Sequence, residues 1–329
     1  MIRALFLLFL AGAVAFGALW VWNPVRLPAL PRLDAAAIPE DLDAYLAGRE
    51  GVVPGITPGT EKRIVWAGAP GVRTPLAIVY LHGFSATSEE IRPVPDRAAA
   101  ALGANLYFAR LAGHGRDGEA LATATLEDWL TDLAEAMAIG ARIGDRVIIV
   151  GTSTGATLAL AGMGTPQIAA ALPGAGSVAG FVFVSPNLRL ADKIAGALLD
   201  APGVGWWGPL IVGRTRSFAT ENEGHARFWT TRYPTRAVVP MADLMAMARA
   251  VDPGSMRLPL MLVRSPADRV VSPGAAEALG RGWGGPVTDV VVVPGPGIDP
   301  AAHVIAGDIL SPAQTGPVAD LIVRFAEGL

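Results

Sequence analysis

Ser153 lies in the sequence Gly151-Thr152-Ser153-Thr154-Gly155, between an apolar run typical of a strand and a segment typical of a helix. A sharp turn from strand to helix would push the serine hydroxyl out above a sheet, where it could act as a nucleophile. The small residues Gly151 and Gly155 would let the strand and the helix approach each other. The pattern G-x-S-x-G also occurs by chance in glycine-rich chains, so an ordinary strand–helix turn stays open on this motif alone.

A serine nucleophile needs a base, and the chain has four histidines, His82, His114, His225 and His303. His303 lies in a loop after the last predicted strand and before the final helix. The chain order serine, acid, histidine places the base in such a loop. For His114 and His225, a structural hydrogen-bonding role is the simpler interpretation. His303 is therefore the predicted base.

The base needs a carboxylate that fixes its tautomer and stabilises the imidazolium. Asp268, in "RSPADRVV", follows a predicted strand and so belongs at the carboxyl edge of the sheet. Asp252 precedes that strand and belongs at the opposite edge. Asp299 shares a loop with His303 and is a weaker alternative. The sequence therefore predicts Ser153 as nucleophile, Asp268 as acid and His303 as base.

An acyl-transfer site also needs amides that bind the oxyanion of the tetrahedral intermediate. The amide of Thr154, directly after the nucleophile, is one candidate. The other is the amide of Phe84 in "LHGFSA", which follows an earlier strand. In that segment His82 and Gly83 would shape the turn. The predicted oxyanion hole therefore consists of Phe84 and Thr154.

These residues need a scaffold, and strands and helices alternate along most of the chain from residue 62. Such alternation predicts a mostly parallel sheet with helices on both faces, and ligands bind beyond the carboxyl ends of its strands. Apolar runs predict strands at 62–66, 75–81, 105–111, 146–150, 180–187, 258–263 and 289–295. Helical spacing predicts helices at 88–102, 125–140, 154–162, 274–282 and 312–328, the first with a cap-like start in "TSEE".

The alternation breaks between residues 188 and 252, where helical segments and tryptophans occur without a convincing strand. We interpret this segment as a helical cap inserted into a core formed by residues 61–187 and 253–329. The cap tryptophans, Trp206, Trp207 and Trp229, could line an acyl pocket or simply pack against the core.

The N-terminus contains nineteen consecutive residues without a charge, 4–22. A helix of that length is roughly 28 Å long, which is close to the thickness of the bilayer core. Arg3 precedes the run, so residues 1–23 predict a transmembrane anchor with the body on the outer side. A cleaved signal peptide with a small-residue site at 13–15 stays open, which would give a secreted protein. A proline-rich connector at 24–60, with a short helix near 39–47, follows.

Composition excludes several classes of function. The net charge of −3 leaves no basic surface for nucleic acid. The absence of cysteine excludes disulfides and thiolate chemistry. No two histidines have the spacing of metal ligands on a helix, so no metal is expected.

Several segments together resemble the α/β-hydrolase superfamily, and within it the monoacylglycerol-lipase and carboxylesterase group of serine hydrolases. They are "YLHGFSAT", "ARLAGHGRD", "TLEDWLTDL", "VIIVGTSTGATLAL", "SPADRVVSP" and "AHVIAGD", in family order from about residue 75 to 329. The resemblance implies an eight-stranded sheet, a helical cap after strand 6 and no cofactor. It implies the same roles for Ser153, Asp268 and His303, and a structural role for His114. Thr154 departs from the pattern, since leucine, methionine or glutamine is common there.

The expected activity is hydrolysis of carboxylic esters with an apolar acyl chain, through an acyl-enzyme on Ser153. A thioesterase or peptidase on the same scaffold stays open, because the triad alone does not distinguish these bonds. A non-catalytic binding module is less favoured, since no element of the predicted site is missing. The expected partners are a small-molecule ester and, through residues 1–23, a membrane.

Overall fold

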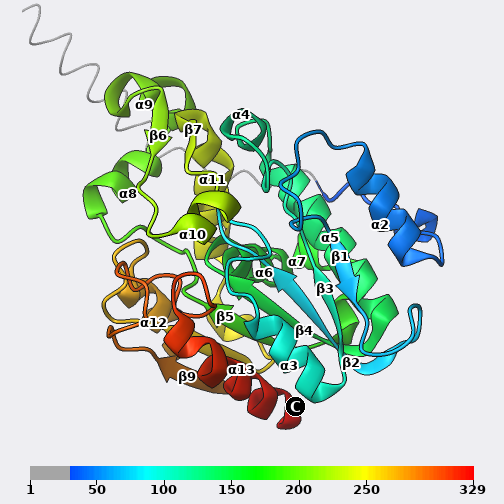
Figure 1. Ribbon diagram of the computed structural model, residues 1–329. Coiled ribbons are helices and arrows are strands. Elements are labelled where there is room, and N and C mark those ends of the chain that lie inside the picture. The colour runs from blue at the N-terminus through cyan, green and yellow to red at the C-terminus, as the bar shows by residue number, and fades with distance from the viewer. Residues whose placement is uncertain (1–29) are drawn as a thin grey trace, which may run out of the picture.

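The computed structural model describes residues 30–329 (Figure 1). The predicted anchor at 1–23 and the first part of the connector lie outside this range. Within residues 30–329, none of the helices is both long and apolar enough to cross a membrane.

The centre of the molecule is a seven-stranded sheet with the order β1-β3-β2-β4-β5-β8-β9. All neighbouring strands are parallel except β1, which runs antiparallel to β3 at the edge. The strands are β1 (Arg63–Val65), β2 (Thr74–Leu81), β3 (Asn105–Phe108), β4 (Gly144–Thr152), β5 (Val178–Val184), β8 (Leu260–Arg264) and β9 (Val287–Val291). Each of the seven strands expected from the sequence is present.

The expectation of an eighth strand is wrong for the described part of the chain. The residues that precede β1 form helix α2 (Leu42–Gly51), whose first turn is capped by the Asp41 carboxylate. The sequence of α2 is rich in good helix formers and contains no run of β-branched residues. The cap therefore follows the fifth strand along the chain, β5, and not a sixth.

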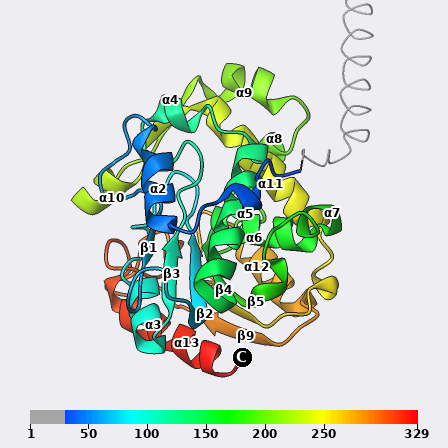
Figure 2. The ribbon, with the colours of Figure 1, turned by 90° about the vertical axis from the view of Figure 1, so that its right-hand side faces the viewer.

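Helices cover both faces of the sheet, as Figure 2 shows. Alternate residues of β2 point to opposite faces, so that Val79 packs with one layer and Ile78 with the other. The first layer contains α5 (Leu126–Ile143), α6 (Thr154–Gly164) and α12 (Pro273–Gly282), with α7 (Pro166–Ala169) beside them. The second layer contains α3 (Val94–Leu102) and α13 (Pro312–Glu327). This is the fold class that the sequence predicted.

Local sequence signals predict the start of one helix, α5, correctly and the start of another, α3, wrongly. The predicted cap of α5 is present as a capping box: the Thr125 side chain accepts from the Asp128 amide, and the Asp128 carboxylate accepts from the Thr125 amide. The predicted start of a helix at residue 88 is wrong, because α3 begins at Val94. A proline disfavours helical backbone in the residue before it, and Pro93 follows Arg92 and takes the N-cap position of α3. Residues 88–93 are turns and bends instead, and Glu90 among them lines the cavity described below.

The cap, residues 188–252, contains α8 (Lys193–Leu199), α9 (Val204–Val212), α10 (Glu223–Phe228) and α11 (Val239–Ala250). The expectation of a cap without strands is wrong, since β6 (Thr215–Ser217) pairs antiparallel with β7 (Arg232–Pro234). Three polar, exposed residues are too few to give an alternating pattern in the sequence. Helix α11 packs on the first layer and belongs to the same hydrophobic cluster as α5 and α6.

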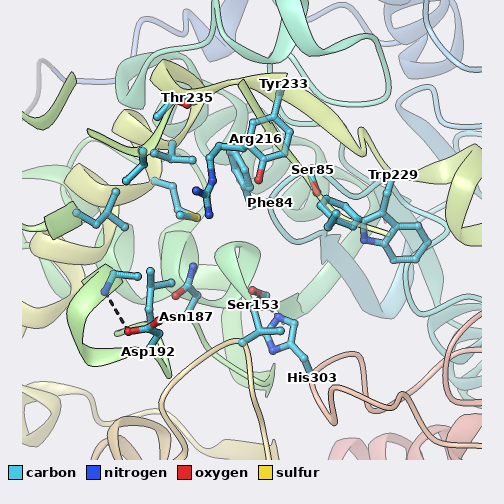
Figure 3. Close-up of a pocket in the computed structure, with 18 of the residues that line it drawn as sticks. Phe84, Ser85, Ser153, Asn187, Asp192, Arg216, Trp229, Tyr233, Thr235 and His303 are labelled. Atoms are coloured by element: carbon cyan, nitrogen blue, oxygen red, sulfur yellow. Dashed lines mark hydrogen bonds between the residues drawn. The ribbon is translucent and has the colours of Figure 1, made fainter. Parts of the chain in front are cut away.

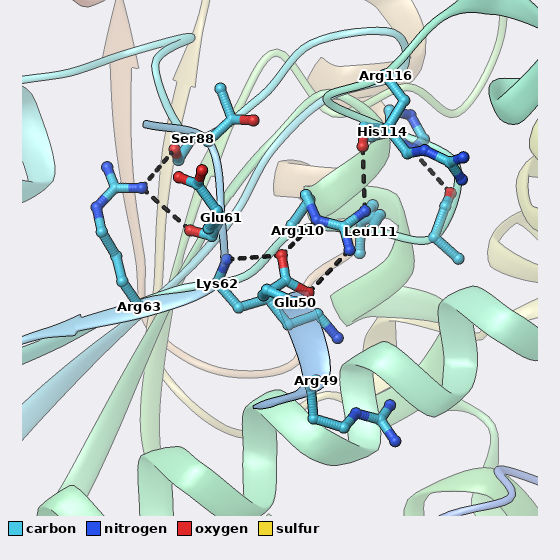
Figure 4. Close-up of polar contacts among 12 residues, drawn as sticks. Arg49, Glu50, Glu61, Lys62, Arg63, Ser88, Arg110, Leu111, His114 and Arg116 are labelled. Carbon is cyan, nitrogen blue, oxygen red and sulfur yellow. Dashed lines mark hydrogen bonds and ion pairs between the residues drawn. The ribbon is translucent and has the colours of Figure 1, made fainter. Parts of the chain in front are cut away.

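Buried ion pairs connect α2 and β1 to the loop after β3 (Figure 4). The Arg110 guanidinium donates to both carboxylate oxygens of Glu50, at 2.6 and 2.8 Å. The Lys62 ammonium pairs with Asp132, at 2.8 Å, and with Glu135. Asp132 also accepts from the Ala112 amide at 2.6 Å. Because Asp132 lies on α5, its bond to the Ala112 amide holds the residue 110–114 loop against that helix. Removal of one member of the cluster would leave a buried charge unpaired.

Candidate active site

Ser153 lies at the carboxyl end of β4, where the chain turns into α6. Its backbone has φ 51° and ψ −113°, a strained conformation for a residue with a side chain. A Cβ atom on Gly151 would lie 2.6 Å from the Ala156 nitrogen, and one on Gly155 would overlap the Leu81 carbonyl oxygen. Both positions therefore require glycine, as the predicted turn demanded.

The structure brings Ser153, His303 and Asp268 into one hydrogen-bonded chain. The Ser153 Oγ lies 3.1 Å from His303 Nε2, and His303 Nδ1 lies 2.8 Å from Asp268 Oδ2. Since the carboxylate only accepts, Nδ1 donates to Asp268 and Nε2 is left to accept from the serine hydroxyl. Only 5% of the Ser153 surface is exposed. The arrangement can transfer a proton from the serine hydroxyl to the imidazole.

Two acidic residues near His303 make different contacts. The other oxygen of Asp268, Oδ1, accepts from the amides of Val270 and Val271, at 2.8 and 2.9 Å. Asp299 accepts from the backbone amides of His303 and Val304, at 3.0 and 2.9 Å, and not from the imidazole. Asp268 therefore orients the ring, while Asp299 orients the loop that carries it.

The surroundings of His303 favour the imidazolium. Burial disfavours the charged ring, but the hydrogen bond and the charge of Asp268 outweigh this and raise the pKa of His303 above 6.5. Glu90 and Asp299 contribute in the same direction. A ring that gains a proton during a reaction is thus stabilised at this position.

The amides of Phe84 and Thr154 lie in the two turns that follow β2 and β4. Within residues 30–329, neither amide donates a hydrogen bond to a protein acceptor. Both remain available for an oxygen atom of a ligand. The Thr154 side chain is fully buried, and its hydroxyl has no partner among the described residues.

Two buried histidines, His82 and His114, stabilise the turn that carries Phe84. His82 donates from Nδ1 to the Gly83 carbonyl oxygen at 2.9 Å and accepts at Nε2 from the Leu111 amide at 3.1 Å. Burial lowers the pKa of His82 to about 4, so this ring is neutral at physiological pH. The His114 ring packs against both His82 and Phe84. These contacts hold the turn that carries Phe84 in place after β2.

A cavity of about 800 Å³ opens beside Ser153 and His303, between the sheet edge and the cap (Figure 3). Its polar lining includes Asn187 and Arg216, whose side chains point into the space. Most of the lining is apolar and includes Phe84, Leu199, Trp207, Trp229, Met241 and Val304. Two of the three cap tryptophans thus line the cavity. The third, Trp206, is 83% exposed.

Comparison with known proteins gives the family. The chain matches the alpha/beta hydrolase family over residues 78–313, which is more than half of its length. The protein is an alpha/beta hydrolase.

Known relatives of this hydrolase include lipases. It is 26% identical over 225 residues to the thermostable monoacylglycerol lipase of Bacillus sp. (strain H-257), which covers 63% of this chain and 76% of the relative. Similar solved structures include one from a study of the metagenome-derived lipolytic enzymes LipS and LipT, with a TM-score of 0.65 and 19% identity over 83% of this chain and 100% of that one. Another is a soluble variant of monoglyceride lipase from Saccharomyces cerevisiae, with a TM-score of 0.56 and 13% identity over 82% and 90%. At these identities the structures support the fold.

Sequence reasoning missed two contributors to the site of this hydrolase. Ser185, at the end of β5, donates to the carbonyl oxygen of His303 at 2.7 Å. Glu90 is buried beside the Phe84 turn and lines the same cavity as Ser153. Its segment, "TSEE", predicted a helix start, and only the folded chain shows that one of the two glutamates turns inward.

Proposed function

We propose that this hydrolase cleaves carboxylic esters through an acyl-enzyme on Ser153. The observation that carries the proposal is the hydrogen-bonded chain from Ser153 through His303 to Asp268, beside the unpaired amides of Phe84 and Thr154. The similarity to a Bacillus monoacylglycerol lipase supports esters of the acylglycerol type as the substrate class.

In the proposed reaction, the Ser153 oxygen attacks the ester carbonyl carbon while His303 Nε2 takes the hydroxyl proton. The carbonyl oxygen becomes an oxyanion that the amides of Phe84 and Thr154 bind. The C–O bond to the alcohol then breaks, and the imidazolium gives its proton to the departing alkoxide. A water molecule, deprotonated by His303, attacks the acyl-enzyme and releases the acid.

The mostly apolar lining of the cavity supports a substrate with an apolar acyl chain. Each buried CH₂ group contributes about 0.8 kcal/mol to binding, which corresponds to roughly a fourfold gain in kcat/KM until the cavity is full. We therefore expect kcat/KM to rise through a series of p-nitrophenyl esters and then to level off or fall. Steady-state assays over the series measure this.

The same assay separates the alternatives. Acyl-CoA and aminoacyl arylamides with matched acyl groups are expected to react more slowly than the esters. A preference for acyl-CoA would instead identify a thioesterase, and a preference for arylamides a peptidase. If no substrate reacts and a fluorophosphonate does not label Ser153, the protein is a binding module.

We also propose that residues 1–23 anchor the protein in a membrane with the body on the outer side. The support is the uncharged run at 4–22 together with the exposed apolar side chains of α9, Trp206, Leu210 and Ile211. The described chain begins close to the start of α5, where the Arg32 amide donates to Thr131 Oγ1. The start of α5 lies at the carboxyl edge of the sheet, the edge that the cap also covers.

The anchor predicts how the full chain behaves on fractionation. The wild type is expected to remain in the membrane pellet after a carbonate wash. A Leu8→Arg, Leu10→Arg variant is expected in the supernatant, because each arginine in a span costs about 3 kcal/mol. Leu30→Arg, which lies beyond the run, is the matched control and is expected to stay in the pellet. A wild-type chain that begins after residue 15 by N-terminal sequencing would show that the segment is a cleaved signal instead.

A further inference from the structure

Glu90 is a buried carboxylate at the base of the turn that carries the Phe84 amide. Only 2% of its surface is exposed. Its Oε2 atom accepts from the Gly83 amide at 2.6 Å, a short bond of the kind expected for an ionised acceptor. The Tyr80 hydroxyl, on β2, lies 3.2 Å from the same oxygen. Glu90 is thus bonded to the residue directly before Phe84.

The fold places this side chain inward by several constraints. The Glu90 amide donates to the Thr87 carbonyl oxygen at 3.1 Å, which closes a turn. Gly83 leaves room for the carboxylate, because a Cβ atom there would lie 2.6 Å from Glu90 Oε1. The neighbouring Glu89 points the other way and pairs with Arg63 and Arg92, at 3.1 and 2.7 Å.

Glu90 differs from Glu89 in its charged partners. Within residues 30–329 no lysine or arginine forms an ion pair with this carboxylate, whereas Glu89 has two such partners. The Tyr80 hydroxyl bonds to Glu90 and also lies 3.2 Å from Thr152 Oγ1, next to Ser153. His303, which can become positive, lines the same cavity as Glu90 from a different loop. Asp268 and Asp299 are the other acids that face His303.

The ionisation of Glu90 falls in the physiological range. Burial raises the pKa of Glu90 to about 7, and the Gly83 amide, His303 and Tyr80 oppose that rise. In turn, the ionised carboxylate helps to raise the pKa of His303. A carboxylate buried without a basic partner is costly, so its placement against the site favours a functional role over a purely structural one.

Resting on the proposed ester hydrolysis, we propose that Glu90 is a positioning residue that fixes the Gly83–Phe84 turn and supports the positive charge on His303. Through Gly83 it holds the Phe84 amide directed at the position of the oxyanion. Through its charge it stabilises the imidazolium that forms when Ser153 loses its proton. Both effects act most strongly in the transition state, where charge is separated. We therefore expect loss of Glu90 to change kcat more than KM.

The test compares Glu90→Gln with Glu89→Gln in the full chain, using a p-nitrophenyl ester at pH 6 and pH 8.5. Glutamine keeps the shape and can accept from Gly83, but it cannot become charged. At pH 8.5, where Glu90 is ionised, we expect kcat of Glu90→Gln to be about tenfold below wild type, with KM within about threefold. At pH 6, where the wild-type carboxyl is largely protonated, the difference is expected to shrink to about twofold or less. Glu89→Gln is expected to match wild type at both pH values.

Two further variants guard against a folding defect. Gly83→Ala pushes a methyl group against the Glu90 carboxylate and is expected to lower kcat at both pH values, because this displacement of the turn does not depend on the charge of Glu90. In the Glu90→Gln, Gly83→Ala double variant the two losses are expected to be less than additive, because both changes act on the contact between Gly83 and the side chain at position 90. Titration of Ser153 with a fluorophosphonate gives the fraction of folded sites, so that kcat is stated per competent molecule.

Equal kcat for wild type and Glu90→Gln at pH 8.5 would overturn the positioning role while leaving the proposed function intact. A loss of the same size at both pH values would overturn the proposed support of the positive charge on His303, because it would not depend on the ionisation of Glu90. A wild type that neither hydrolyses esters nor reacts with the fluorophosphonate would instead remove the proposed function itself.

Discussion

Ser153→Ala is expected to lower kcat for p-nitrophenyl esters by about 10⁴- to 10⁶-fold, because the residue that would form the acyl-enzyme is gone. The remaining activity would come from the amides of Phe84 and Thr154 and from substrate binding. The folded state is expected to persist, since Ser153 contributes a short side chain at a turn that its neighbouring glycines already permit. Steady-state kinetics and a thermal unfolding midpoint measure the two effects.

Ser255→Ala is the matched control for this change. Ser255 is exposed at the end of a short 3-10 helix (Pro253–Ser255) before β8, at the sheet edge opposite the site, and its hydroxyl donates to the Asp252 carbonyl oxygen. It should keep wild-type kcat and remain reactive toward a fluorophosphonate, whereas Ser153→Ala should lose both. Ester hydrolysis that survives Ser153→Ala would reject the proposed mechanism.

Asp268→Asn is expected to lower kcat by about 10³- to 10⁴-fold. An asparagine can present its NH₂ group to His303 Nδ1, which favours the tautomer that cannot accept from Ser153. The change also removes a charge that raises the pKa of His303. Since the neutral imidazole is the active form of the base, the acidic limb of the remaining activity should move to lower pH. A kcat–pH profile of both proteins measures the shift.

Asp299→Asn tests whether the position of the carboxylate matters. Asp299 also lies near His303, but it accepts from the backbone amides of residues 301, 303 and 304. Its loss is expected to cost less than about tenfold in kcat, mainly through the loop, and to shift the acidic limb less than Asp268→Asn does. A larger effect at Asp299 than at Asp268 would contradict the assignment of the acid.

The sheet and the main site residues could be predicted because their signals are local or follow from chain order. Buried parallel strands such as β2 and β4 are continuous apolar runs, which few other elements produce at that length. Ser153, Asp268 and His303 each follow a strand of that sheet. Parallel strands end at one edge, so three residues that are far apart in sequence were expected to meet there.

The features that could not be predicted depend on contacts between distant segments. Nothing local distinguishes Glu90, which turns toward Gly83, from Glu89, which faces Arg63 and Arg92. The short strands β6 and β7 exist only as a pair, and neither has a pattern of its own. The start of α3 is a different kind of error, because Pro93 is visible in the sequence and outweighs the cap-like "TSEE".

The buried ion pairs of α2 and β1 bear on how this hydrolase can be shortened. The match to its family begins at residue 78, but Glu50 and Lys62 lie before that boundary. A fragment cut at the boundary would lack the partners of Arg110, in the loop that carries His114, and of Asp132, on α5, and the His114 ring packs against Phe84. We therefore expect a fragment that begins before α2 to be more stable than one that begins at residue 78, where the family match begins.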